Sequence, residues 1–235
     1  MVWSSFVGGV GSFELQAQVY AADTSLVAPA PPFVSALDQN QISVTWPELA
    51  GFTNVARYLL YVDSNPVPVA VTNTYHVVSD LIPGSVHTFR LAFELTDGRT
   101  SAMSTAVTGQ TWGRDGNFDG LPDDWQSQFW GSSSANWPGS QVDSDGDGAS
   151  NIQEFLAGTD PTDPNSVLRV QIVTTSQGPR LNWNTQPGLM YQIQASPDLS
   201  VWNNIGALRF APGTNDSMAV AGGGAATYYR IVRIR

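Results

Sequence analysis

The stretch that decides the fold is Asp143–Glu154, which reads DSDGDGASNIQE. Aspartates stand at its first, third and fifth positions, glycine stands sixth and glutamate twelfth. This is the spacing of a calcium loop. There, positions 1, 3 and 5 supply side-chain oxygens, position 7 a backbone carbonyl, position 9 a ligand often bridged by water, and position 12 a bidentate carboxylate. The candidate ligands of this downstream loop are, in order, Asp143, Asp145, Asp147, Ala149, Asn151 and Glu154.

A second copy of the pattern, the upstream loop, covers Asp115–Gln126. Its twelfth position is Gln126, a neutral and weaker ligand than glutamate. We therefore expect two Ca²⁺ sites, the upstream one looser or closed by Asp123 or by an acid from elsewhere. The alternative for each loop is a polar turn rich in Asp and Gly. The candidate ligands of the upstream loop are Asp115, Asn117, Asp119, Leu121 through its carbonyl, and Asp123.

Each loop leads into a short helical pattern. Pro122 suits a first helical turn, while Gly131 and Gly158 are natural C-terminal stops. We expect the two helices to pack their apolar stripes on each other. These stripes are Trp125, Phe129 and Trp130 after the upstream loop, and Ile152, Phe155 and Leu156 after the downstream loop.

The segment from Asp115 to Pro164, with its motifs DGLPDDW and NIQEFLAGTDPTDP, resembles the dockerin-type or thrombospondin type 3-like calcium segments of large secreted bacterial proteins. The resemblance implies calcium binding and an extracellular setting. A dockerin would also pair with a cohesin partner. Here, however, the loops lie between two β regions instead of ending an enzyme.

Short strand patterns fill residues 33–112, separated by turn residues, as in a β-sandwich. This region resembles fibronectin type III. Trp46 matches that family's strand-B tryptophan, Leu81–Gly84 followed by Phe89 resembles the turn before strand F, and His87 stands in place of the corner tyrosine. The expected strands cover residues 42–46, 58–62, 67–71, 87–91 and 102–107.

A second β region covers residues 167–235, with alternating patterns at 168–172, 181–183, 191–195 and 229–234. It resembles the small C-terminal sandwiches that follow calcium segments in secreted proteins of environmental bacteria, a likeness that implies architecture and no activity. We therefore expect a mainly β chain of two immunoglobulin-like or fibronectin III-like sandwiches joined by a loop-helix calcium segment. The expected units are an N-terminal strand segment (1–27), a sandwich (28–112), the calcium segment (113–166) and a second sandwich (167–235).

At the N-terminus, Phe13, Leu15, Ala17 and Val19 alternate with polar residues, as in a half-buried strand without a partner close in sequence. It is either the last strand of a truncated module, a strand added to the next sheet, or a strand donated to another copy. The last reading makes residues 1–22 a candidate for self-association.

Composition narrows the setting of the protein. The net charge of −10 argues against nucleic acid or an anionic membrane surface, and no apolar run is long enough to cross a membrane. Cysteine is absent, so disulfides do not staple the chain. No leader pattern stands at the N-terminus, and we expect a secreted or cell-surface protein, or a piece of one.

Catalytic motifs are missing, and neither His76 nor His87 stands in a nucleophile pattern, so we expect no enzyme. Three hypotheses remain. The first, which we favour, is a calcium-stabilised structural or adhesive protein, which strand donation would assemble into a filament. The second is a polysaccharide-binding module, and the third is dockerin-like pairing with another surface protein. The candidate sugar-stacking aromatics are Trp112, Trp137, Trp202 and Tyr228.

Overall fold

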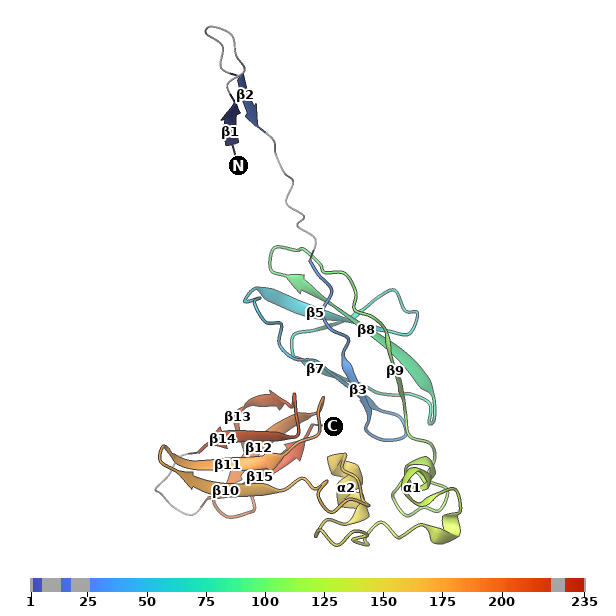
Figure 1. The fold of residues 1–235 in the computed structure, drawn as a ribbon. Helices are drawn as coiled ribbons and strands as arrows, with labels where there is room; N and C mark the ends of the chain where they lie inside the picture. The colour runs from blue at the N-terminus through green and yellow to red at the C-terminus, as the bar shows by residue number, and fades with distance from the viewer. Residues whose placement is uncertain (1, 6–13, 18–25, 221–226, 235) are drawn as a thin grey trace.

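The computed structural model describes residues 2–5, 14–17, 26–220 and 227–234. Over these residues the chain is mainly β, with two sandwiches and a segment between them that carries two short helices (Figure 1). The predicted fold class is confirmed. No helix among the described residues has the length and apolar character needed to span a bilayer.

The first sandwich pairs a three-stranded sheet, in the order β3-β4-β7, with a four-stranded sheet, in the order β6-β5-β8-β9. All of its strand pairs are antiparallel. This three-plus-four arrangement is that of a fibronectin type III-like module, as predicted. The strands are β3 (Phe33–Ala36), β4 (Ile42–Thr45), β5 (Val55–Val62), β6 (Val69–Val71), β7 (Tyr75–Val78), β8 (Val86–Leu95) and β9 (Val107–Gln110).

Trp46 lies at the centre of this sandwich, with its ring 5.3 Å from that of Tyr58. The last strand starts later than predicted: residues 102–106 are irregular, and β9 begins at Val107. The reason is that the serine hydroxyls of Ser101 and Ser104, instead of backbone carbonyls, accept hydrogen bonds from the backbone of β8.

The C-terminal sandwich consists of two three-stranded sheets, β10-β11-β14 and β13-β12-β15. Alternation along β11 and β12 turns Leu181, Trp183 and Ile193 into the core between the sheets. The strands are β10 (Val170–Thr175), β11 (Gly178–Asn184), β12 (Met190–Ser196), β13 (Asn203–Phe210), β14 (Asn215–Ala219) and β15 (Tyr228–Arg233).

The connecting segment holds α1 (Asp123–Trp130), a short 3-10 turn (Ser134–Asn136) and α2 (Asn151–Ala157). As predicted, the two helices pack together, with the rings of Trp125 and Phe155 5.4 Å apart. Two residues of the stripe predicted for α2, Ile152 and Phe155, pack in this helical core, but the third, Leu156, is exposed. The polar residues Asn151 and Glu154, two candidate ligands, are buried as well.

The two sandwiches also touch each other directly, which the sequence does not indicate. On β4 the residues that point away from the core, Ser43 and Thr45, are buried as fully as the core residues. The Thr45 hydroxyl donates a hydrogen bond to the Gly188 carbonyl of the C-terminal sandwich. The ring centroids of Phe33 and Phe210 lie 5.4 Å apart across the same junction.

At the N-terminus, β1 (Val2–Ser5) pairs antiparallel with β2 (Glu14–Ala17), and Val2 lies opposite Ala17. The expectation that this strand has no partner nearby in the sequence is therefore wrong. The hydrophobic pattern misses the pairing because β1 has only four residues and lacks strict alternation. The predicted strand residues Phe13 and Val19 lie outside the described residues.

Candidate metal centre

The downstream loop is curled by hydrogen bonds from its own backbone to its aspartates. Asp143 accepts from the amides of Gly146 (2.7 Å) and Gly148 (2.9 Å), one on each carboxylate oxygen. Asp145 accepts from the Asp147 amide at 3.1 Å. Gly148 has φ +99°, a conformation that side-chain-bearing residues rarely adopt, which explains the glycine at position 6. These bonds turn the carboxylates toward one point.

Three carboxylates gather around that point, and further buried oxygens of the loop lack a hydrogen-bond donor. One carboxylate oxygen from each of Asp143, Asp145 and Asp147 lies within 4.8 Å of the others. Leaving a buried polar atom unpaired costs about 1–3 kcal/mol, and more when it is charged, so a set of five demands a partner. The five buried oxygens without a hydrogen bond are Asp145 Oδ2, Asp147 Oδ2, Asn151 Oδ1, Glu154 Oε1 and Glu154 Oε2.

The Glu154 carboxyl has a strongly raised pKa. Its burial, and then the negative charges of Asp145 and Asp147, raise the pKa of this carboxyl to about 8. A divalent cation among these groups would reverse the penalty. Calcium takes six to eight oxygen ligands of this kind, so the residues present fit calcium. Ala149, at position 7, is the candidate for a backbone carbonyl ligand.

Neighbouring groups hold the loop in place. The Asn151 side-chain amide donates to the Gly139 carbonyl at 3.0 Å, which leaves its oxygen for the loop centre. Arg169, at the start of the C-terminal sandwich, donates from Nη2 to the Asp147 carbonyl at 2.8 Å. Sequence reasoning misses Arg169, because an exposed arginine that binds a distant carbonyl leaves no motif.

The upstream loop brings most of its predicted ligands together but fills its centre differently. Gln126, fully buried, donates from Nε2 to Asp119 at 2.8 Å and accepts from the Asn117 amide at 3.3 Å. Asp123 turns to the Gly116 amide, which donates to it at 3.0 Å. Asp115 accepts from the amides of residues 119 and 120, while the Leu121 side chain is buried in the helical core. As it stands, this loop does not fit a cation.

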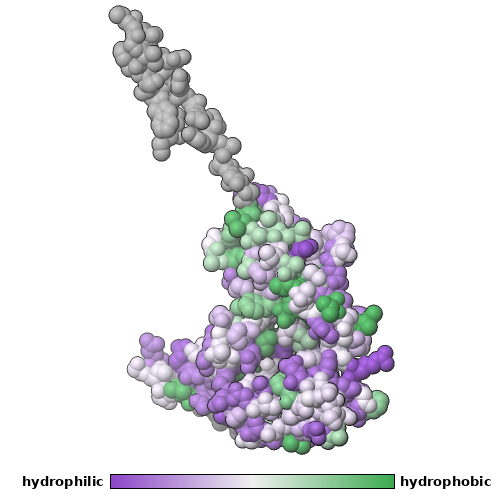
Figure 2. Space-filling view, turned by 45° about the vertical axis from the view of Figure 1, so that its right-hand side comes forward, coloured by the Kyte–Doolittle hydropathy of each residue, from purple (hydrophilic) through white to green (hydrophobic). Residues whose placement is uncertain are grey.

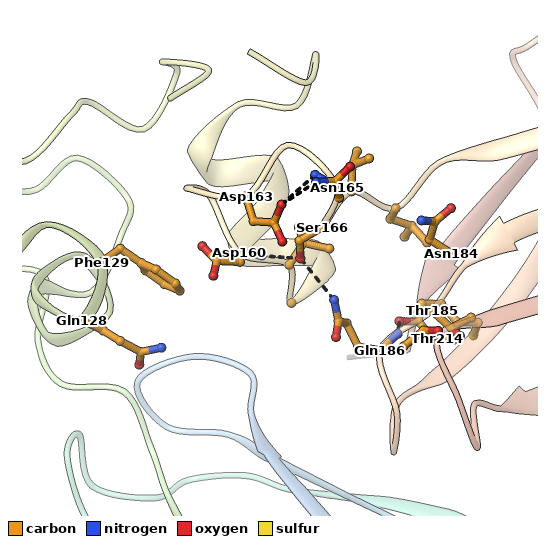
Figure 3. A pocket seen from close by; sticks show the side chains of 15 residues that line it. Gln128, Phe129, Asp160, Asp163, Asn165, Ser166, Asn184, Thr185, Gln186 and Thr214 are labelled. Atoms are coloured by element: carbon orange, nitrogen blue, oxygen red, sulfur yellow. Dashed lines mark hydrogen bonds between the residues drawn. The ribbon is translucent and has the colours of Figure 1, made fainter. Parts of the chain in front are cut away.

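A separate cavity of about 510 Å³ lies between α1, the chain after α2, and the C-terminal sandwich (Figure 3). Phe129 and Gln128 of α1 face it from one side, and Asp160 and Ser166 from another. The Ser166 hydroxyl oxygen accepts hydrogen bonds from the Asp160 backbone amide (2.9 Å) and from Gln186 Nε2 (3.3 Å). Most of the side chains that line the cavity can donate or accept a hydrogen bond, and could therefore bind the hydroxyl groups of a ligand.

Most of the aromatic residues proposed for sugar stacking are already engaged. Trp112 packs in the helical core against Phe155. The Trp202 ring is covered by the Arg230 guanidinium, 4.3 Å from the ring centroid. Trp137 donates from its indole nitrogen to the Gly131 carbonyl at 2.6 Å. Tyr228 is the exposed member of the set.

Both histidines, His76 and His87, lie on strands of the first sandwich. His87 binds Asp63 at 2.8 Å through Nδ1 and Ser85 at 2.7 Å through Nε2. Burial lowers the pKa of His76, which lies on β7. His87 therefore has hydrogen-bond partners within the first sandwich, and His76 lies partly buried on one of its strands.

No family model matches this chain, and no curated protein matches it either. Among solved structures, it is similar to the fibronectin type III domain of human fibronectin type III domain containing protein 3 (17% identity, 42% of this chain, 96% of that chain, TM-score 0.35). It is also similar to the sixth such domain of that human protein (18%, 41%, 94%, 0.35). A third similar structure is the Yersinia enterocolitica family 28 exopolygalacturonase (16%, 41% of this chain, 23% of that chain, 0.34).

Proposed function

We propose that this chain is a non-catalytic, calcium-stabilised structural or adhesive module of an extracellular or cell-surface protein. The observation that carries the proposal is the set of five buried, unpaired oxygens in the downstream loop, two of them on Glu154. Such a set lowers the stability of the fold, and a bound cation would remove that cost. Asp143, Asp145, Asp147, Asn151 and Glu154 would hold the ion with their side chains, and Ala149 with its carbonyl.

The position of the loop gives the ion a structural role. Glu154 lies on α2, and the helix ends at Gly158, where an added Cβ would lie 2.5 Å from Arg233 Nη1 of the C-terminal sandwich. Arg233 in turn donates to Ser35 of the first sandwich. The ion would therefore brace a helix that abuts the junction of the two sandwiches.

The same chemistry supports the extracellular setting that we propose. The chain has no cysteine, so an ion is its available staple. Calcium modules outside the cell bind with dissociation constants of roughly 10⁻⁴–10⁻³ M, a range in which even a modest site is occupied there. Half of the 20 acidic residues fall in residues 115–163, and bound calcium would offset part of that charge.

Calorimetric titration of chelator-treated protein with CaCl₂, paired with thermal unfolding, tests the proposal. We expect saturable binding and a raised Tm, since ligand at 100 times its dissociation constant stabilises the folded state by about 2.7 kcal/mol. MgCl₂ is the control, because magnesium dehydrates reluctantly and needs a tighter geometry. If calcium produces no heat of binding and no change in Tm, the proposal is contradicted.

Assembly through residues 1–22 remains part of the proposal, in a modified form. Because β2 already pairs with β1, the donated element would be a two-stranded hairpin that adds to an open sheet edge. Light scattering on the full chain and on a chain lacking residues 1–22 tests this. Assemblies formed only by the full chain support it, and monomers in both samples contradict it.

We propose neutral-saccharide binding as a second candidate function, because one observation favours it: the cavity beside α1 combines hydroxyl-binding groups with the Phe129 ring. Sugars bind through such a combination of hydrogen bonds and an aromatic face. Titration with soluble neutral hexasaccharides, followed by NMR, tests it. We expect binding that Phe129→Ala abolishes and Tyr228→Ala leaves intact. No binding, or equal loss in both variants, contradicts a site in this cavity.

A further inference from the structure

The two loops share one backbone conformation. In both, position 6 donates its amide to the first aspartate: Gly120 to Asp115 and Gly148 to Asp143, each at 2.9 Å. Position 5 likewise donates to the third residue in both loops, and position 7 to the fifth. Position 4 has positive φ in both, +58° at Phe118 and +82° at Gly146. The difference between them therefore lies in side chains.

At the centre of the upstream loop, hydrogen bonds fix an amide in place. The Asp119 backbone amide donates to Asn117 Oδ1 at 3.2 Å, which orients the Asn117 side chain and turns its NH₂ group toward Gln126. Gln126 must then present its oxygen to Asn117 and its own NH₂ to Asp119, at 2.8 Å. A reversed Gln126 amide would set oxygen against a carboxylate. Its orientation follows from the backbone.

The twelfth residue thus closes each loop by a different chemistry. Glu154 is fully buried and leaves two oxygens without a donor, whereas Gln126 is fully buried and donates, together with Asn117, to Asp119 Oδ2. All residues of the upstream loop are described, and none of their side-chain oxygens is buried without a partner. An N–H group that points at the carboxylate occupies the place where a cation would be bound, and repels it.

We infer that the upstream loop folds without a cation, that Gln126 is the residue which excludes it, and that the chain binds one Ca²⁺ instead of two. This rests on the proposed calcium binding at the downstream loop. The upstream loop is then a permanent brace: its internal bonds hold α1 against α2 whatever the calcium concentration, while the downstream loop responds to it.

Calorimetric titration with CaCl₂ measures the stoichiometry of the intact chain and three variants. We expect one ion for the wild type, two for Gln126→Glu and none for Glu154→Gln. Gln128→Glu is the matched control, because it adds the same charge to an exposed position of α1 outside the loop, and we expect it to retain one. Circular dichroism without calcium confirms that each variant is folded.

The outcomes separate this inference from the proposed function. If the wild type binds two ions, the inference is overturned but the proposed function stands. If the wild type binds no ion, both the inference and the proposed function are overturned. One ion that survives in Glu154→Gln places the ion in the wrong loop and overturns both. One ion on Gln126→Glu overturns the role of Gln126. If a position-12 variant does not fold, Asp115→Asn and Asp143→Asn replace it. We expect Asp115→Asn to bind one ion and Asp143→Asn to bind none. The reverse result overturns the inference.

Discussion

Arg233 of β15 donates a hydrogen bond from Nη2 to the Ser35 hydroxyl of β3 at 2.8 Å, although 198 positions separate the two residues in the chain. The same guanidinium lies beside Gly158 at the end of α2. A cation suits the C-terminal end of a helix, where carbonyls are left without partners. This buried arginine therefore contacts the first sandwich, the calcium segment and its own sandwich.

Replacing this arginine should weaken the junction. Arg233→Ala removes the bond to Ser35 and leaves a cavity, and we expect a loss of about 2–4 kcal/mol in the free energy of unfolding, measured with urea. Arg230→Ala on the same strand is the control, because its exposed stacking on Trp202 contributes about 1 kcal/mol or less. Equal losses in the two variants would contradict the role given to Arg233.

Close approach of the sandwiches depends on Gly188. Its φ is +84°, and an added Cβ would lie 2.4 Å from Phe33 Cδ1 and 2.8 Å from Phe33 Cβ. We expect Gly188→Ala to cost about 1–3 kcal/mol through backbone strain and overpacking, while Gly213→Ala, where a Cβ meets nothing, is near neutral. Urea unfolding measures both. Phe33→Ala in the Gly188→Ala background should restore part of the loss, and failure to do so would place the cost elsewhere.

Losing a ligand of the downstream loop should loosen the chain before α2. The amides of Asn151 and Ile152 donate to the carbonyls of Val142 and Ser140, so the helix and this chain are held together. In calcium, we expect Asp147→Ala to be cut by thermolysin near Val142 at least about tenfold faster than wild type, as local opening costs less free energy. Mass spectrometry locates the cut.

Asp163→Ala controls for removal of an aspartate outside the loop. The first sandwich, residues 33–112, should stay intact in the Asp147→Ala digest, because its core does not involve the loop. Simultaneous loss of that sandwich would show that the calcium segment and the sandwich unfold as one unit.

The ion-free protein should become less stable as pH rises. Burial and the neighbouring aspartates raise the pKa of Glu154 from an ordinary 4.5 to about 8. Between these values the folded state holds a proton that the unfolded state has lost, so the free energy of unfolding falls with increasing pH. We expect urea midpoints in excess chelator to be lower at pH 8.5 than at pH 6. Glu154→Gln should flatten the difference, and a midpoint that rises with pH in the wild type would contradict the assignment.

The tight turns of the two Asp- and Gly-rich loops and the helix ends could be predicted because their chemistry is local. Asp143–Glu154 carries its ligands within twelve positions, and Gly131 and Gly158 end the helices where the sequence indicates. Ile152 and Phe155 of the α2 stripe pack as predicted, whereas Leu156 is exposed and the polar residues Asn151 and Glu154 are buried. A hydrophobic pattern cannot anticipate polar side chains that are buried.

Several strands escaped prediction for a different reason. β3, β7 and β13 are short or half-buried, and only the strands beside them make them regular. β4 is the reverse case: Ile42 and Val44 predict its core face, but Ser43 and Thr45 on the other face are buried too, and Thr45 donates to Gly188 of the second sandwich.

The sequence by itself determined the order of the units, the positions of both loops and the ligand types that each offers, because these depend on neighbours within a few residues. The tertiary structure alone decided how the two sandwiches meet, through Arg233, Gly188 and Phe33, and which carboxylates are left without donors. The physical reason is that a hydrogen bond is a property of two groups. Gln126 meets Asp119 and Asn117 within its own loop, whereas Arg233 and Ser35, 198 positions apart, meet only when the two sandwiches pack together.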